Sequence, residues 1–365
     1  MDDSDPPVMM PPPPTQNPAA RGSAINPPNR FEKLSIELEP EAMVDEDGEP
    51  LPRRTQFYRD SSQSIITYND SPDIPFDASI NPYRGCEHGC AYCYARPSHE
   101  YLGFSAGLDF ESKIMVKEDA PELLRKELSK KNWKPQVLAM SGITDCYQPI
   151  ERRLEITRRC LEVLAEFRNP VGIVTKNHLV TRDIDHLRKL AEFHAVRVSI
   201  SITTLDADLA KALEPRASRP SRRLAAVREL SEAGIPVSVM TAPIIPGLND
   251  HEIPDLLREA AQAGAQGAGY TVLRLPWAVA PLFEQWLDRH APGSKEKVLG
   301  RIREMRGGKL YDAKFGARMK GEGIFAEQIK TLHAVARKRA GFLEKPYSPL
   351  STASFRVPSD QLMLF

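Results

Sequence analysis

Apolar runs of strand length alternate with amphipathic stretches of helix length through the middle of the chain. Residues 196–202, for example, read VRVSISI, whereas residues 151–167 carry apolar side chains at helical spacing. Near-continuous apolar runs favour strands that are buried on both faces. Strands are predicted at 136–142, 171–175, 196–202, 237–245 and 270–275, and helices at 151–167, 184–193, 224–233 and 253–263.

The regular alternation predicts an α/β fold with a parallel sheet. Strand and helix recur every 25–40 residues or so, the length of a β–α unit with a crossover helix. A full eight-fold barrel needs about 250 residues. The stretch from Ile80 to Pro276 has room for about six units. We therefore expect a partial (β/α)6 TIM-like barrel, within a domain that spans residues 61–290.

The segments on either side of this domain differ in composition. Residues 1–60 hold 12 of the 32 prolines and 12 acidic against 6 basic residues, so a mostly disordered N-terminal segment is predicted. Residues 68–79 are expected to form an extended lead-in. A helical C-terminal extension is expected at 291–350, where Lys295 to Lys345 include 14 basic and 6 acidic residues. That excess indicates either a basic surface or a solvated helical face. Residues 351–365 are expected to be a flexible tail.

Composition excludes several classes of protein. The formal net charge is zero, so no overall basic field would hold a nucleic acid. No apolar run reaches the roughly 18 residues of a membrane span, so no membrane partner is expected. The five cysteines do not suit a secreted disulfide scaffold, and the first residues lack a secretory signal pattern. A reducing cytoplasm is the expected location.

Three of the cysteines lie within eight residues, in the sequence NPYRGCEHGCAYCYARP. Cys86, Cys90 and Cys93 have the spacing C-x-x-x-C-x-x-C, and Gly85 and Gly89 let the backbone wrap around a bound centre. A [4Fe–4S] cluster has four irons, each normally held by a cysteine. Three ligands would leave one iron open for chemistry.

Two other interpretations of the cysteines remain. Structural zinc needs four ligands, and His88 or His99 would supply the fourth. Alternatively, the cysteines are ordinary buried side chains.

The pattern C-x-x-x-C-x-aromatic-C resembles the signature of the radical S-adenosylmethionine (radical SAM) superfamily. The resemblance implies a [4Fe–4S] cluster on Cys86, Cys90 and Cys93, whose open iron chelates S-adenosyl-L-methionine. It also implies reductive cleavage to a 5′-deoxyadenosyl radical that abstracts a substrate hydrogen. A one-electron donor such as flavodoxin or ferredoxin would then be a partner. The aromatic residue, Tyr92, would lie near the adenine; the alternative is loop packing.

Further segments resemble one branch of that superfamily. SGITDCYQPIE, VTKN, TRDIDHL, VSISITTLD, LEPRASRPSRR and APIIPGLND are similar to the spore photoproduct lyase-like branch, often labelled DNA repair photolyases. The similarity covers roughly residues 65–290 and is greatest to a bacterial subgroup with a C-terminal extension. It implies a DNA substrate, in repair or modification. The alternatives are a protein or small-molecule substrate, or a metal-stabilised scaffold without enzymatic activity.

Functional groups in α/β barrels lie where strands give way to loops. Superfamily members place a small polar segment after one such strand to bind the methionine amino group. The matching positions here are Ser141, Gly142, Thr144 and Asp145. Asp145 would accept a hydrogen bond from the ammonium group, or else cap the following helix.

The same resemblance extends to two later strands. Lys176, Ser199 and Ser201 would face the cofactor carboxylate and ribose, with a structural role as the alternative for Ser201. Cys146 is a candidate hydrogen-atom donor, since a cysteine has that role in spore photoproduct lyase; a packed small side chain is the favoured alternative. Cys160 lies on an apolar helix face and is expected in the core.

Four arginines follow Glu214 closely. Arg216, Arg219, Arg222 and Arg223 would suit either phosphates or intramolecular carboxylates.

The chain ends in Gln-Leu-Met-Leu-Phe. Gln361, Leu362, Leu364 and Phe365 resemble the short peptide by which bacterial repair proteins bind the DNA polymerase sliding clamp. The alternative is a terminus that packs against its own domain. Clamp binding would support a DNA substrate independently of the cysteine loop.

Overall fold

The computed structural model describes residues 22–23, 25–31, 55–342 and 349–358. Within these residues the larger sheet has seven strands in the order β10-β9-β8-β7-β6-β3-β2. They are β2 (Ile66–Tyr68), β3 (Ala78–Ile80), β6 (Leu138–Met140), β7 (Val171–Thr175), β8 (Val196–Ser201), β9 (Val237–Ile244) and β10 (Ala268–Val272). All neighbours from β3 to β10 are parallel, and β2 is an antiparallel edge. The sheet confirms the expected partial barrel of six parallel strands.

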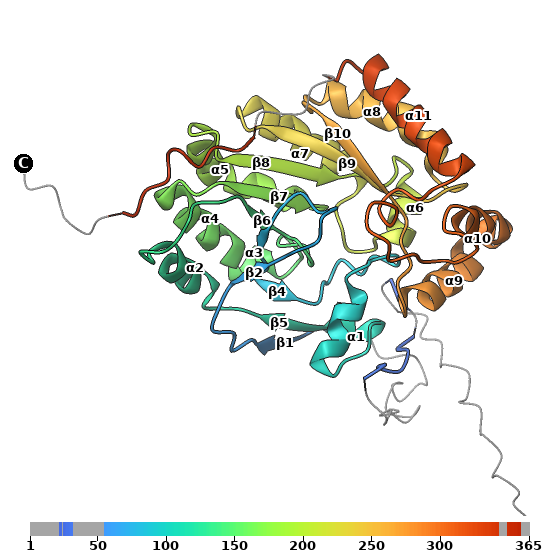
Figure 1. Ribbon diagram of the computed structural model, residues 1–365, viewed down its shortest axis with the longest axis horizontal. Helices are drawn as coiled ribbons and strands as arrows, with labels where there is room; N and C mark the ends of the chain where they lie inside the picture. The colour runs from blue at the N-terminus through green and yellow to red at the C-terminus, as the bar shows by residue number, and fades with distance from the viewer. Residues whose placement is uncertain (1–21, 24, 32–54, 343–348, 359–365) are drawn as a thin grey trace, which may run out of the picture.

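Helices cover the outer face of this sheet (Figure 1). On β8, Val196, Val198 and Ile200 are fully buried in the core that α5 and α7 share, whereas Ser199 and Ser201 point to the opposite face. The inner face of the barrel therefore carries the polar side chains. The helices before residue 265 are α1 (Leu108–Ser112), α2 (Ala120–Leu128), α3 (Glu151–Leu154), α4 (Ile156–Phe167), α5 (Ile184–Ala191), α6 (Ala207–Leu213), α7 (Pro220–Glu232) and α8 (Ile253–Gln262).

The single helix predicted at 151–167 is wrong in one respect, because it is broken between α3 and α4. Glu155 adopts a left-handed backbone with φ of 52°. The Glu151 carboxylate accepts a hydrogen bond from the backbone N–H of Thr157 at 3.0 Å, so it caps the first turn of α4. That contact requires the chain to bend back between the two helices.

Parts of the segment 1–60, which was expected to be mostly disordered, are built into the fold. β1 (Gln56–Arg59) pairs with β5 (Lys113–Val116) in a small sheet that also contains β4 (Tyr83–Arg84). Residues 22–23 and 25–31, the N-terminal strap, lie against η2 (Arg96–Leu102) and α1. Polar contacts hold this proline-rich strap without an apolar core of its own. The remaining residues before Thr55 lie outside the described part of the chain.

The C-terminal extension shares a core with the cysteine loop. It begins with α9 (Val279–His290) and α10 (Lys295–Glu304), and α11 (Ile324–Arg339) packs along α8. Phe283 and Leu299 belong to one buried cluster with Cys90 and Tyr92. The predicted boundary at residue 290 therefore does not separate two cores.

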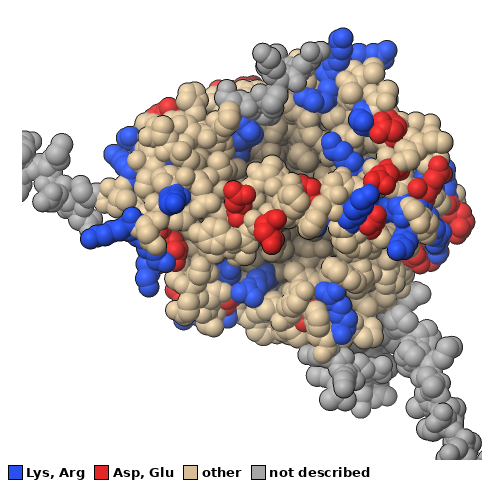
Figure 2. All heavy atoms as spheres, viewed as in Figure 1, with Lys and Arg blue, Asp and Glu red and all other residues tan. Residues whose placement is uncertain are grey.

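Charge on the extension is uneven. Figure 2 shows Lys and Arg side chains gathered over α8 and α11 at the upper right, but mixed with Asp and Glu over α9 and α10. The visible face is thus not one continuous basic surface.

An ion pair links the two edges of the open sheet. Asp73, in the hairpin between β2 and β3, accepts hydrogen bonds from the Arg318 guanidinium (2.7 Å to Nε) and from the Gly316 N–H (3.3 Å). Arg318 lies beyond β10, since the Val272 N–H donates to the neighbouring Met319 carbonyl. β2 and β10 are the two edge strands, so this contact closes the seam of the partial barrel.

The flexibility expected of residues 351–365 is wrong for residues 351–358. The Ser351 N–H donates to the His194 carbonyl and the Arg356 N–H to the Phe167 carbonyl, both at 2.9 Å. Phe355 packs against Phe167, with ring centroids 6.2 Å apart. Residues 351–358 therefore dock where β7 and β8 begin, and Figure 1 shows this segment on the side away from the strand ends. Gln361, Leu362, Leu364 and Phe365 lie outside the described residues.

No helix in the described part of the chain is both long and apolar enough to span a membrane.

Candidate active site at the cysteine loop

The cysteine loop follows β4 and bends at two glycines. Gly85 and Gly89 have φ values of 80° and 65°, which L side chains rarely adopt. A Cβ on Gly89 would lie 2.6 Å from the Glu111 carboxylate. The loop can therefore follow its path against α1 only because these positions lack side chains.

A buried arginine holds the middle of the loop. Arg96 has no exposed surface, and its Nε and Nη2 donate to the Cys90 carbonyl at 3.0 and 2.8 Å. The same guanidinium pairs with Glu111, whose carboxylate also accepts the N–H groups of Gly22 and Ser23 at 2.8 and 2.7 Å. The strap, α1 and the loop are thus joined by one network of charge-assisted hydrogen bonds.

Glu87 joins the loop to the arginine segment. Its buried carboxylate accepts the Ile150 N–H at 2.7 Å and pairs with Arg216 at 3.0 Å. Arg223, by contrast, pairs with Glu214. These two arginines bind intramolecular carboxylates, the second of the two interpretations of this segment. Arg219 and Arg222 are exposed.

The three thiols are suited to an iron–sulfur cluster. All three cysteines are free of disulfides; Cys86 and Cys90 are buried and Cys93 is partly open. Burial raises the pKa of the Cys90 thiol well above its ordinary value, and the negative charges of Glu214, Cys93 and Cys86 raise it further. The sulfurs therefore lie within electrostatic range of one another, and a bound metal centre would offset the cost of ionising them.

The described residues do not form a ready-made site for a single zinc ion. Among the described residues, no three His, Cys, Asp or Glu side chains meet around a point where one metal ion would fit. Ligands of one zinc ion must meet in this way, whereas thiolates of a cluster bind different irons. Of the two candidate fourth ligands, His88 contacts Asp145 and Asn177, and His99 is buried between Phe104 and Phe110.

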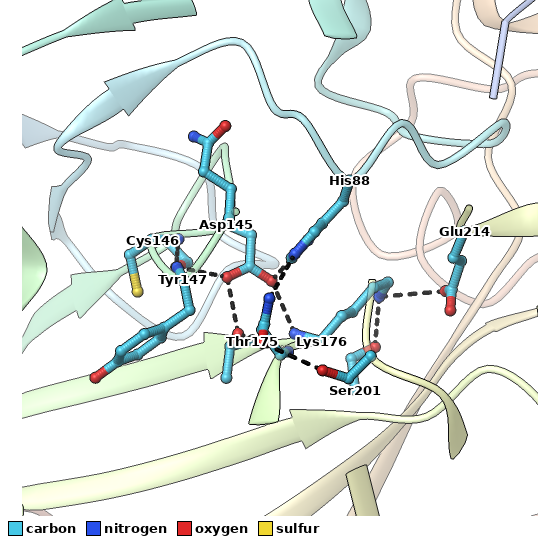
Figure 3. Close-up of polar contacts among 12 residues, drawn as sticks. His88, Asp145, Cys146, Tyr147, Thr175, Lys176, Ser201 and Glu214 are labelled. Atoms are coloured by element: carbon cyan, nitrogen blue, oxygen red, sulfur yellow. Dashed lines mark hydrogen bonds and ion pairs between the residues drawn. The ribbon is translucent and has the colours of Figure 1, made fainter. Parts of the chain in front are cut away.

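Asp145 joins the loop after β6 to the end of β7 (Figure 3). One carboxylate oxygen accepts the Tyr147 N–H and the Thr175 hydroxyl at 2.9 and 2.8 Å; the other accepts the Lys176 N–H at 2.8 Å and lies 3.4 Å from His88 Nδ1. Burial alone would raise the pKa of Asp145, but His88 and these hydrogen bonds lower it to about 2. The carboxylate caps no α-helix and has its acceptor sites occupied, so it positions the strand ends.

Lys176 and Ser201 meet on the inner face of the barrel (Figure 3). Lys176 Nζ donates to Ser201 Oγ at 2.6 Å and lies 3.9 Å from the Glu214 carboxylate. Nζ is also 5.9 Å from the Tyr92 ring centroid. The structure thus brings together three residues predicted from the sequence, namely Lys176, Ser201 and Tyr92.

A buried carboxylate at the centre of this group was not among the predicted site residues. Glu214 is fully buried and accepts hydrogen bonds from Tyr92, Arg223 and Thr203. Burial would raise the pKa of Glu214, but Arg223 and Lys176 lower it to about 2. The one available signal was its place beside the arginines in LEPRASRPSRR.

The other predicted residues have local partners. Ser141, with φ of 74°, accepts the Cys146 N–H, and the Gly142 carbonyl accepts the Tyr94 hydroxyl. Thr144 donates to the Tyr83 carbonyl. Ser199 bonds to Ser238 on β9 rather than to Lys176.

Cys146 is fully buried in the main core, and Figure 3 shows its sulfur turned away from His88 and Lys176. This position favours the packed side chain over the hydrogen-atom donor. Cys160 lies in the same core, as predicted.

The sequence of residues 80–260 matches the radical SAM superfamily. An uncharacterized protein of Mycobacterium tuberculosis is 35% identical over 234 residues, which cover 64% of this chain and 68% of the relative. The chain belongs to the radical SAM superfamily. It is therefore an enzyme, not a scaffold, and membership implies a [4Fe–4S] cluster and S-adenosylmethionine.

Two further relatives are more distant in sequence. A protein of Pseudomonas phage M6, named a radical SAM Nalpha-GlyT isomerase, is 28% identical over 58% of this chain and 42% of its own length. Spore photoproduct lyase in complex with a dinucleoside spore photoproduct has a similar fold, with a TM-score of 0.56, 16% identity and coverage of 78% of this chain and 79% of that one. The expected likeness to the spore photoproduct lyase fold is confirmed.

Proposed function

We propose that this radical SAM enzyme holds a [4Fe–4S] cluster on Cys86, Cys90 and Cys93 and acts on a nucleic-acid substrate. The observation that carries the proposal is the grouping of three free thiols with Lys176 and Ser201 at the mouth of the six-stranded barrel. When bound, the cluster and S-adenosylmethionine would supply a 5′-deoxyadenosyl radical for hydrogen abstraction.

The chain's own residues would bind and orient the cofactor. Lys176 carries a positive charge on the inner face of the barrel, where a carboxylate would find a charge-assisted partner. The Ser201 hydroxyl is suited to a ribose or carboxylate oxygen. The buried pair of Glu214 and Arg223 lies behind the Lys176 and Ser201 side chains and holds them in position. The Tyr92 ring lies over the Lys176 ammonium. Aliphatic and aromatic side chains of α9 and α10 pack against the loop and exclude water from its far side.

The substrate class rests on two likenesses. Spore photoproduct lyase, which shares this fold, has been seen with a dinucleoside spore photoproduct bound. The segments that resemble its branch also imply a DNA substrate. A chemical change to a base requires that the base leave its stack, so base extrusion or a single strand is expected. A protein or small-molecule substrate would keep the same cofactor site.

The decisive experiment is anaerobic reconstitution followed by an assay for 5′-deoxyadenosine with dithionite, with and without damaged DNA. The wild-type protein should take up iron and release 5′-deoxyadenosine. The Cys90→Ala variant should lose at least about 100-fold of that activity, since one cluster ligand is gone. The Cys160→Ala variant, a core cysteine outside the loop, is the matched control. A well-reconstituted wild-type protein that releases no 5′-deoxyadenosine would sink the proposal.

We further propose a one-electron donor such as flavodoxin or ferredoxin, and a reducing cytoplasm as the location. The five cysteines are all free, and an iron–sulfur cluster with an open iron needs reducing surroundings. Residues 361–365 are proposed to bind the sliding clamp. The docked segment 349–358 supports this, because it lies where β7 and β8 begin, away from the barrel mouth, and leaves that mouth open to substrate.

A deletion of residues 361–365 tests clamp binding. Loss of binding to purified sliding clamp, with unchanged release of 5′-deoxyadenosine, is expected. Unchanged clamp binding would contradict this part of the proposal.

A further inference from the structure

A row of exposed and partly exposed rings and guanidinium groups begins beside the cysteine loop. Tyr94 follows Cys93 directly; its ring is 48% exposed and its hydroxyl donates to the Gly142 carbonyl at 3.0 Å. Arg274, just after β10, places its guanidinium 4.4 Å from the centroid of that ring. The row therefore starts where β6 and β10 end, at the mouth of the barrel.

The row continues outward through Trp277. Its ring is 58% exposed, 5.9 Å from the Tyr311 ring and 4.2 Å from the Arg30 guanidinium. Trp277 follows Arg274 by three residues, so the segment after β10 joins the two halves. We call this set the aromatic platform: Arg30, Tyr94, Arg274, Trp277 and Tyr311. Phe31 and Tyr101, also exposed, flank Arg30.

Trp277 lies in a conformation that needs an explanation. Its φ of 44° falls in the left-handed region, which is uncommon for a bulky side chain and costs free energy. The strained backbone holds the largest aromatic side chain away from the core, toward solvent. Such strain persists where the surrounding structure enforces it, often at ligand sites. A ligand that covers the ring is the simplest use for it.

The chemistry of the platform suits nucleobases. Aromatic faces interleaved with guanidinium groups are typical of surfaces that stack unpaired bases. Part of the charge is already balanced, since Arg30 pairs with Glu100 at 2.8 Å. However, the adjoining loop from Arg306 to Lys320 has five basic residues and one acidic residue, with Lys309, Lys314 and Lys320 exposed. Stacking by the rings, assisted by this charge, would recognise a base on a phosphate strand.

We propose that the aromatic platform stacks an unpaired nucleobase next to the base that reacts, and so guides a single strand to the barrel mouth. This inference rests on the proposed nucleic-acid substrate. It adds that the substrate is single-stranded and that it reaches the barrel mouth along the platform. Three separate parts of the chain build the platform: the strap, the cysteine loop and the region after β10.

The test compares two short fluorescein-labelled strands by fluorescence anisotropy with the full-length protein. One is an oligothymidylate, and the other is an abasic strand of the same length, which keeps the phosphates but has no bases to stack. The wild-type protein should prefer the strand with bases. The Trp277→Ala variant should lose roughly 5- to 100-fold in affinity for that strand and much less for the abasic one. Trp277→Phe should retain most of the preference.

Two further variants test whether the effect comes from the platform. Tyr311→Ala removes a second ring from the platform without touching the strained Trp277 backbone, and should also reduce the preference. Phe57→Ala removes a partly exposed ring beside Arg153 on the small sheet, and should leave binding unchanged.

The outcomes separate this inference from the proposed function. If the wild-type protein binds the strand and both platform variants keep its preference for bases, the platform inference is overturned while a nucleic-acid substrate stands. If the wild-type protein binds neither strand at low salt, the nucleic-acid substrate itself fails. Release of 5′-deoxyadenosine is judged by its own assay in either case.

Discussion

At the scale of the residue, the strongest constraint is the buried ion pair behind the cofactor-facing side chains. Glu214 and Arg223 are both nearly without exposed surface. Arg223 also donates to the carbonyls of Ser201 and Ser218 at 2.9 and 2.6 Å. Breaking such a pair leaves a desolvated charge that has lost its main partner, which costs far more than the pair itself contributes.

Arg223→Met should therefore lower the free energy of unfolding by about 3–5 kcal/mol, measured by urea denaturation. The exposed Arg222→Met is the control and should change it by less than about 0.5 kcal/mol. The double variant Glu214→Leu/Arg223→Met should recover part of the loss, because neither charge of the buried pair remains. Equal losses for both arginines would contradict a structural role for the buried pair.

At the scale of the element, the strap and the cysteine loop are in direct backbone contact. A Cβ on Gly22 would lie 1.4 Å from the Gly89 carbonyl oxygen, which no small adjustment relieves. The strap must therefore leave the loop if Gly22 gains a side chain. Glu111 would then lose two of its backbone donors while it stays buried.

Gly22→Ala should expose the strap to limited proteolysis and lower the free energy of unfolding by about 1–3 kcal/mol, the cost of unsatisfied buried groups. Less iron should also be retained after reconstitution. Gly300→Ala in α10 is the control: outside its own stretch of helix, no heavy atom lies within 4 Å of the added Cβ, so stability should rise by about 0.5–1 kcal/mol. A strap that resists protease in both variants would argue against this contact.

At the scale of the whole molecule, the seam of the partial barrel is closed by Asp73 and Arg318. The Arg318 hydrogen bond lowers the pKa of Asp73 from 3.8 to about 2, with burial opposing it. Because the folded-state pKa is depressed, the pair stabilises the fold above pH 4 or so. That stability is lost as the pH falls from about 4 to about 2.

Asp73→Asn should cost about 1–2 kcal/mol at pH 7, and the cost should shrink by about half at pH 3. Urea denaturation across this pH range measures it. Asp185→Asn is the control, because its carboxylate also has a pKa lowered to about 2, by Arg158, but is 51% exposed. Solvent screening should keep its effect below about 1 kcal/mol. A cost for Asp73→Asn that does not depend on pH would contradict the role of the charge.

The prediction from sequence worked where the signal is local. The cysteine spacing, the strand at Val171 to Thr175 and the helix that ends near Gly234 are each read from neighbouring residues, and the structure agrees with these elements. The regular alternation of strand and helix also predicted about six β–α units. The broken helix at Glu155 was missed because its cause is a side-chain cap, which periodicity does not register.

By itself, the sequence determined the superfamily, the parallel barrel and the three thiols, since each depends on residues close together in the chain. Tertiary structure alone decided which charges meet. Arg318 and Asp73 are 245 positions apart, and Tyr92 and Glu214 are 122. The strap, the docked tail and the aromatic platform likewise arise from segments that only folding brings together. Composition suggested disorder for the first of these, because composition counts apolar burial and does not count the hydrogen bonds that a distant buried carboxylate supplies.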